Sequence, residues 1–376
     1  MRTMFALLAG LIAAGSLAAQ CHKIGEVNAE KPEGQLLQKI GQESDAAKKL
    51  GLLEQFATQF PQHEAIGWVY EQMLDGYLKA NNSDKALEIG EKLDAVPPEC
   101  VETAHQTLKA AEMKKDADQI RKWSAKTSEL ALKVVNSPQP KEQDEVEDWK
   151  RRVDYAKQVN TYTEYALYAA ALQNSDPQKK IELLEALEQR NPNSQYLAQA
   201  YPQLFLAYQQ AKQADKASGL AEKLVAAGHA DEDMLVVLAD NYLQKKTDPE
   251  KVHTYSARII EIMNSKPKTA GVADAAWAQR KNLLIGLAHY MSGKQYYLQN
   301  KFAESDKELS EALPLVEVNQ GMKAETLFLL GIADYKMEKA QEAVNHFRAC
   351  AAIPSPYKAE ATKNIARIRQ QYAGIR

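Results

Sequence analysis

Apolar residues recur at three- and four-residue spacings along almost the whole chain, and alternation with period two is nearly absent. Leu, Ala, Glu, Lys and Gln dominate these segments, and all five are good helix formers. Turn residues interrupt the pattern at short intervals, at positions 60–61, 81–83, 96–98, 137–140, 191–193, 247–249 and 353–356. The pattern therefore predicts roughly fifteen helices, mostly of about 12–18 residues, joined by tight turns.

Some helix boundaries can be predicted from single residues. Asp176-Pro177 and Asp248-Pro249 each place an acceptor side chain at a helix N-cap and a proline at the first helical position. The stretches 137–144 and 265–273 are longer and irregular, so we expect the array to bend there. Residues 141–172 lack such breaks and are expected to form one unusually long helix.

Regular breaks of this kind call for a search for internal repeats. The pattern W-x2-L-G-x2-Y, then A-x3-F, then proline, describes a 34-residue helical hairpin, and several staggered segments fit parts of it. The fitting positions are Tyr70, Tyr77, Ala86, Tyr201, Leu204, Tyr208, Ala217, Leu224, Tyr242, Gly293, Tyr296, Ala312, Leu330, Gly331, Ala343, Phe347 and Pro354. Their small residues would let paired helices approach closely, and their tyrosines would fill the space between successive hairpins.

On these positions the chain resembles the tetratricopeptide repeat family, in particular its exported bacterial members. The resemblance implies an all-α fold, a right-handed superhelical solenoid of stacked antiparallel helical hairpins. It is weakest over residues 100–175, where helical pairs occur without clear signature residues, and the spacing of Gly293 and Gly331 exceeds the 34-residue period.

The N-terminus has its own pattern. One arginine, a short charge-free run rich in Ala and Leu, and small residues before Gln20 are typical of a secretory signal peptide. We therefore expect a signal peptide over 1–19 with cleavage near Ala19, a linker over 20–33, and a repeat array over 34–376 that ends in a capping helix at 357–376. The protein would be periplasmic or secreted, with no transmembrane segment in the mature chain. In the alternative, Cys21 is the lipid-bearing residue of a lipoprotein, although Gln20 stands where a small residue is expected.

Composition narrows the function. Hydrophobic residues make up 45% and charged residues 26% of the 376 residues, as in folded domains. The formal charge of −3 shows no basic excess for nucleic acid. Three cysteines, at 21, 100 and 350, are too few and too scattered to predict a disulfide framework.

Motifs for chemistry are missing from the sequence. It contains no phosphate-binding loop, no G-x-G-x-x-G and no H-E-x-x-H. His346 and Cys350 share a helix face, but two donors are too few for zinc, and core packing is the simpler interpretation. We therefore expect no catalytic residues, no metal and no cofactor, and a protein that is not an enzyme.

The 17 tyrosines are the unusual residues. Most should pack between repeats, but some could line a concave surface, where an apolar ring with a hydroxyl suits peptide binding. The spacing puts Tyr290, Lys294 and Tyr297 on one helix face, with Tyr335 expected beside Tyr297 from the next repeat.

These four residues are the predicted partner-binding patch, suited to a peptide with an apolar side chain near a carboxylate. The predicted function is an exported scaffold or adaptor that binds a partner protein or peptide. Two alternatives stay open, a lipid-anchored structural subunit of an envelope assembly and a binding protein for a small molecule or glycan.

Overall fold

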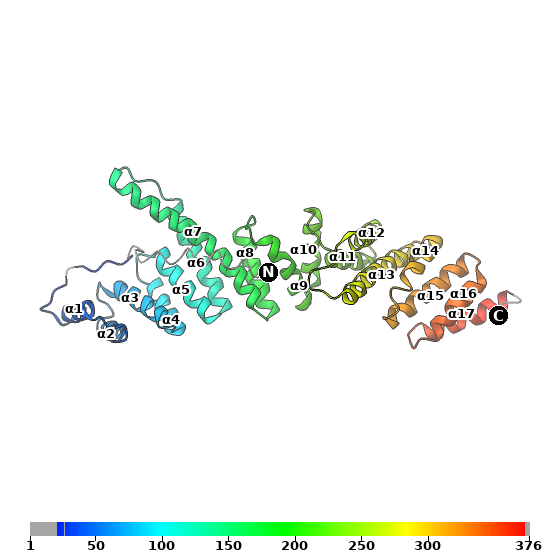
Figure 1. The fold of residues 1–376 in the computed structure, drawn as a ribbon, viewed down its shortest axis with the longest axis horizontal. Helices are drawn as coiled ribbons and strands as arrows, with labels where there is room; N and C mark the ends of the chain where they lie inside the picture. The colour runs from blue at the N-terminus through cyan, green and yellow to red at the C-terminus, as the bar shows by residue number, and fades with distance from the viewer. Residues whose placement is uncertain (1–20, 26, 373–376) are drawn as a thin grey trace. The chain divides into compact units, whose positions relative to one another are not determined.

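The computed structural model describes residues 21–25 and 27–372, and the predicted signal peptide lies outside them. The described residues form seventeen α-helices and no strand (Figure 1). They divide into two compact units, and the boundary in the sequence falls after Ala211. No helix among the described residues has both the length and the apolar character needed to cross a bilayer. The predicted all-α stack of helical hairpins is confirmed, while its right-handed superhelix stays a prediction.

The first unit consists of nine helices. They are α1 (Pro32–Gln42), α2 (Ala46–Gln59), α3 (Ile66–Lys79), α4 (Ser83–Asp94), α5 (Val101–Lys114), α6 (Ala117–Val135), α7 (Gln143–Gln173), α8 (Pro177–Arg190) and α9 (Leu197–Gln210). Each helix packs on the next, and α3, α5 and α7 also contact one another in turn. The predicted long helix is confirmed as α7, whose N-terminal part extends past its neighbours in this unit (Figure 1).

The second unit consists of eight helices. They are α10 (Ala214–Ala226), α11 (Glu232–Lys245), α12 (Pro249–Ser265), α13 (Asp274–Leu298), α14 (Phe302–Ala312), α15 (Gln320–Lys336), α16 (Ala340–Ala351) and α17 (Lys358–Gln371). Consecutive helices pack here too, and α11, α13 and α15 form the second series of contacts. The C-terminal helix exists as predicted, although its role as a cap is still a prediction.

The turns inside six of the hairpins share a backbone motif that the sequence pattern did not reveal. One residue with positive φ lies one or two positions past the end of the first helix in each, namely Asn81, Lys115, Lys212, Lys246, Asn300 and Glu338. In five of these turns the next N–H also donates to a carbonyl five residues back, for example Asn82 N–H to Tyr77 and Lys339 N–H to Asp334. This left-handed closure satisfies carbonyls at the end of the first helix. Asn81 and Lys115 lie 34 residues apart, as do Lys212 and Lys246, so these two pairs of turns keep the period of the repeat, whereas Asn300 and Glu338 lie 38 residues apart.

The small signature residues lie where two helices touch. An added Cβ at Gly331 would come within 2.8 Å of the Phe347 ring, and one at Gly293 within 2.7 Å of Leu309. Ala217 and Ala343 are buried at 1% and 0% exposure. These contacts supply the physical reason for small residues at the predicted positions, since a larger side chain has no space.

The signature tyrosines combine packing with a hydrogen bond to the preceding hairpin. The Tyr77 hydroxyl donates to Glu54, and the Tyr208 hydroxyl donates to Glu185 at 2.8 Å. Both rings are buried. Each carboxylate is 23 residues before its tyrosine, so these pairs link one hairpin to the next.

Two boundary predictions have different outcomes. Asp176 caps α8 as predicted, because its side chain accepts from the Gln178 N–H. The prediction for Asp248 is wrong in part: Pro249 does begin α12, but the Asp248 side chain caps no N–H. Its backbone is left-handed at φ 46°, and its carboxylate is instead 3.5 Å from Lys251 Nζ.

The N-terminal residues carry a covalent link that the cysteine count did not predict. Cys21 forms a disulfide with Cys100, which directly precedes α5. Cys350 is free and buried in the core of the last hairpins, as expected for a packing residue. A lipid thioether at Cys21 would need the sulfur atom that the disulfide already uses. Cys21 cannot carry this disulfide and a lipid at once, and the lipoprotein alternative stays a prediction.

Candidate functional site

The predicted partner-binding patch lies in the second unit, and part of it is assembled. Lys294 Nζ is 3.2 Å from the Tyr290 hydroxyl and 5.5 Å from the centre of its ring. The same ammonium forms an ion pair with Glu325 at 2.7 Å. Burial by itself would raise the pKa of Glu325. The hydrogen bonds from Lys294 and Tyr290 outweigh this effect and hold that pKa below its ordinary value. The cation of the patch is thus already paired inside the chain.

The other two residues of the patch have separate surroundings. The Tyr297 ring packs edge-on against Phe302, with ring centroids 6.2 Å apart. The Tyr335 hydroxyl donates to Gln371 at 2.8 Å, and the Arg367 guanidinium lies 4.9 Å from the Tyr335 ring centre. Both rings remain partly exposed. Their role in binding stays a prediction.

A longer series of aromatic rings lies in the first unit, along α7 and at the start of α9. Neighbouring ring centroids are 5.1–6.2 Å apart, and one pair, Tyr168 with Tyr196, is stacked. In order along the series the rings are those of Tyr155, His105, Tyr162, Tyr165, Tyr196 and Tyr168. The five tyrosines, here called the tyrosine row, are all partly exposed.

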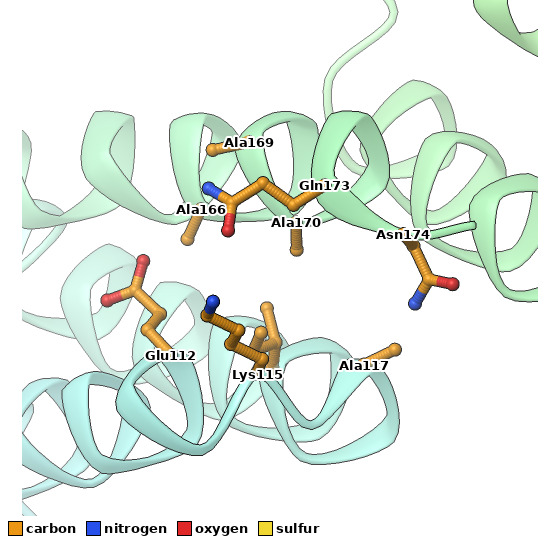
Figure 2. A pocket seen from close by; sticks show the side chains of 9 residues that line it. Glu112, Lys115, Ala117, Ala166, Ala169, Ala170, Gln173 and Asn174 are labelled. Atoms are coloured by element: carbon orange, nitrogen blue, oxygen red, sulfur yellow. The ribbon is translucent and has the colours of Figure 1, made fainter. Parts of the chain in front are cut away.

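A recess adjoins this row, between the end of α5 and the C-terminal turns of α7. Its α7 wall is built by alanines, and Figure 2 shows two of them, Ala166 and Ala170, pointing across it toward Lys115. Its remaining lining residues are Glu112, Ala117, Ile120, Ala169, Gln173 and Asn174. Small apolar side chains on one wall and polar groups at the rim leave space for a side chain and hydrogen-bonding groups for its backbone.

One hydrogen bond connects the tyrosine row to the recess. The Tyr162 hydroxyl donates to Glu112 at 2.7 Å, and Glu112 belongs to the lining of the recess. Tyr162, Ala166, Ala169 and Gln173 follow one another at three- and four-residue steps, so they share a face of α7. The row and the recess therefore form one continuous surface.

Burial controls the protonation of the polar groups beneath this surface. It lowers the pKa of His105 to about 3, assisted by nearby Lys109, so the imidazole is neutral at pH 7. Burial also raises the pKa of Glu112, Tyr155 and Tyr162. A neutral imidazole and protonated hydroxyls supply hydrogen bonds and ring contacts at neutral pH, which suits recognition better than proton transfer.

His105 itself is nearly enclosed, with 6% of its surface exposed. Its Nδ1 lies 3.1 Å from the Tyr155 hydroxyl, whereas its Nε2 has no hydrogen-bond partner among the described residues. The Tyr162 ring stands edge-on to the imidazole. His105 therefore holds two members of the tyrosine row in place from below.

The sequence pattern alone did not select this surface. Except for Tyr196, it belongs to residues 100–175, where repeat signatures are weakest. The available signals were the tyrosines at 155, 162, 165 and 168 and the alanines at 166, 169, 170 and 171. The contacts with His105, Glu112 and Tyr196 come from other helices, so periodicity along α7 could not indicate them.

Comparison with known proteins adds little on function. No protein-family model and no curated protein matches the chain. Similar solved structures include yeast Tom70, with 11% identity and a TM-score of 0.35 over 93% of this chain and 66% of that one. A STAND-type signal transduction ATPase with a tetratricopeptide repeat sensor, from Pyrococcus horikoshii, has 13% identity and a TM-score of 0.31 over 92% and 52%. Human IFIT1 has 12% identity and a TM-score of 0.30 over 94% and 89%. These similarities are too weak to indicate what this chain binds.

Proposed function

We propose that this protein is an interaction scaffold that binds an extended segment of a partner protein on the α5–α7–α9 face of its first unit. The observation that carries the proposal is the tyrosine row, whose partly exposed rings lead into the alanine-walled recess. The surface gathers five aromatic rings with a site for one side chain beside Tyr162.

The chemistry of the surface favours a peptide. Tyrosine offers a broad apolar ring at modest entropic cost, and it is enriched at the centres of protein interfaces. At the recess, Gln173 and Asn174 carry amide groups that can pair with the N–H and C=O groups of an extended chain. A segment with an aromatic or apolar side chain for the row and a small side chain for the recess fits this arrangement.

The C-terminal patch is the rival surface. Its cation, Lys294, would have to leave Glu325 before it could pair with a carboxylate of a partner. Breaking such a pair carries a cost, because a half-buried charge would lose its partner. The tyrosine row requires no such rearrangement, and this difference favours it.

Selection from a displayed peptide library tests the proposal. Peptides selected on the full chain should lose about 2 kcal/mol or more of binding free energy to the Tyr168→Ala/Tyr196→Ala variant, the range of interface hot spots. The matched control is Tyr297→Ala/Tyr335→Ala, which removes two partly exposed rings from the rival patch. Unchanged binding to the first variant with loss in the second would move the contact surface to the C-terminal patch. Circular dichroism of both variants checks that the helices are intact.

We further propose that the chain is exported and that its leader is removed near Ala19. The disulfide supports this, because such bonds persist in oxidising compartments. Mass spectrometry of the N-terminus of the cell-envelope or secreted protein should find a chain that begins near Gln20. An intact Met1 on cytoplasmic protein would overturn the proposal.

A further inference from the structure

The N-terminal end of the first unit gathers metal-binding side chains at one point. One ligand atom each of Cys21, His22 and Glu71 lies within 4.8 Å of the other two. Cys100 adds a fourth donor, because its sulfur is bonded to that of Cys21. His22 and Glu71 are 9% and 7% exposed, so the cluster differs from a group of solvated surface carboxylates.

The imidazole is oriented from both sides. His22 Nε2 lies 3.2 Å from the Val96 carbonyl oxygen. Its Nδ1 lies 2.8 Å from Glu71 Oε1, which is hydrogen-bond distance. With Nε2–H directed at the carbonyl, the Nδ1 lone pair and the Glu71 carboxylate face a common point where a metal ion can bind both. A ligating histidine usually donates its other N–H to a carbonyl in this manner.

The His22 imidazole packs directly against Gly67. A Cβ added at Gly67 on α3 would lie 2.3–2.9 Å from atoms of the His22 imidazole. No larger residue fits there unless the ring moves. Glu71, one turn further along α3, also accepts from the His22 backbone N–H at 3.1 Å. The segment that carries Cys21 and His22 is therefore held against α3 by these contacts, and the disulfide separately joins it to the start of α5.

We propose that this cluster, with the Cys21–Cys100 bond reduced, binds one Zn²⁺ through Cys21, Cys100, His22 and Glu71. Two sulfurs, one imidazole nitrogen and one carboxylate oxygen form a closed tetrahedral set of the kind that structural zinc sites use. Ligand atoms in such a site are about 3.3–3.8 Å apart, given bonds of about 2.0–2.3 Å. To reach those separations, the two sulfurs must move apart after reduction, and His22 Nδ1 and Glu71 Oε1 must open from 2.8 Å.

The reaction balances with a trialkylphosphine as the reductant. The S–S bond breaks, and the phosphine takes one oxygen atom from water and becomes the phosphine oxide. The two hydrogens of that water go to the sulfurs, so both cysteines become thiols. Zinc binding then displaces the two thiol protons, which pass to solvent, and neutral His22 binds through Nδ1 with its hydrogen on Nε2. The segment would be tied to α3 and α5 in both states, by a covalent bond when oxidised and by the metal when reduced.

Titration of the phosphine-treated full chain with Co²⁺, a spectroscopic substitute for Zn²⁺, tests the proposal under anaerobic conditions. One equivalent should produce sulfur-to-cobalt charge-transfer absorption and the visible bands of a tetrahedral ion, and Zn²⁺ should abolish both. The disulfide-bonded chain should bind no cobalt in this way. Cys100→Ser and His22→Gln should each weaken binding by more than about 100-fold, because they remove direct ligands rather than their supports.

The third cysteine supplies the control. Cys350 is buried in the second unit, so Cys350→Ala should bind cobalt like the unchanged chain. As an independent readout, Zn²⁺ should slow alkylation of Cys21 and Cys100 at least tenfold in the reduced chain. Absence of charge-transfer absorption in the reduced chain, or equal binding by Cys100→Ser, would overturn the proposal.

Discussion

The last hairpin of the chain and the α5–α7 region are built from different contacts. In α15 and α16, Gly331 faces Phe347, and Ala343 and Cys350 are fully buried, so the interface is close-packed and mostly apolar, with one partly buried polar pair, Asp334 and His346. Between α5, α6 and α7 the apolar packing is joined by several polar and aromatic contacts. Examples are the Tyr162–Glu112 hydrogen bond and the Ser128–Asn160 hydrogen bond at 2.6 Å.

The difference indicates which part of a repeat protein carries the residues that select a binding partner. Small residues at fixed positions let helices approach, and they leave little chemistry on the surface. Where tyrosines and buried polar groups take their place, the helices still pack, but partly exposed rings and a recess remain. Local departures from a consistent packing rule tend to coincide with functional positions. The weakest repeat signature and all of the candidate site except Tyr196 accordingly fall in the same segment.

The largest expected loss of stability comes from a substitution in the close-packed last hairpin. Phe347→Ala should lower the free energy of unfolding by about 3–5 kcal/mol, since it empties a fully buried ring position. Urea unfolding measures the loss, and hydrogen exchange should localise it to the last hairpins. Phe302→Ala, which removes a half-buried ring, should cost clearly less. Equal losses would show that the last hairpin is not specially close-packed.

Next in size is loss of the disulfide. Cys100→Ser should reduce the stability of the first unit by about 2–4 kcal/mol, because a long loop in the unfolded chain is no longer closed. Amide protection should fall in α3 and α5 and stay constant in α15 and α16. Cys350→Ala, assayed in parallel, should show the reverse distribution. Unchanged protection in α3 would contradict a stabilising role for the link.

Acid should lower the stability of the α5–α7 region, which contains His105, by a smaller amount. Because the pKa of His105 is about 3 in the folded chain and 6.5 for an unperturbed histidine, the unfolded state binds a proton first. The stability that comes from the neutral ring is complete above pH 6.5 and falls as the pH drops toward 3. From pH 7 to pH 4 the loss should be roughly 2–3 kcal/mol.

The variant His105→Gln isolates the contribution of His105 to the pH dependence of stability. The raised pKa values of Glu102 and Glu112 act in the opposite direction, but both groups are present in both proteins. The difference between the two curves of unfolding free energy against pH should therefore follow His105. A flat difference curve would refute the assignment.

The smallest expected effect tests the repeat register. Ala217→Leu or Ala343→Leu should each destabilise the chain by about 1–3 kcal/mol, because there is no space for the added atoms. Damage should spread from the site to neighbouring hairpins rather than through the whole chain. Ala226→Leu, at an exposed position near the end of α10, is the matched control. Urea melts that do not change for either buried variant would show that the register is wrong.

The sequence by itself determined the features that depend on neighbours a few residues apart. Helical periodicity, the breaks, the long α7 and the small residues Gly331 and Ala343 follow from spacings within one helix or one hairpin, so they could be read along the chain. The N-cap at Asp176 is equally local, and the failure at Asp248 arose because its backbone turned left-handed.

Only the tertiary structure decided which distant groups meet. Cys21 and Cys100 are 79 residues apart, and neither lies at a repeat position that would indicate a partner. The pairing of Lys294 with Glu325 and the support of the tyrosine row by His105 each join side chains from different helices. Periodicity tells which face of a helix is buried, but the side chain that it touches there depends on how the hairpins stack.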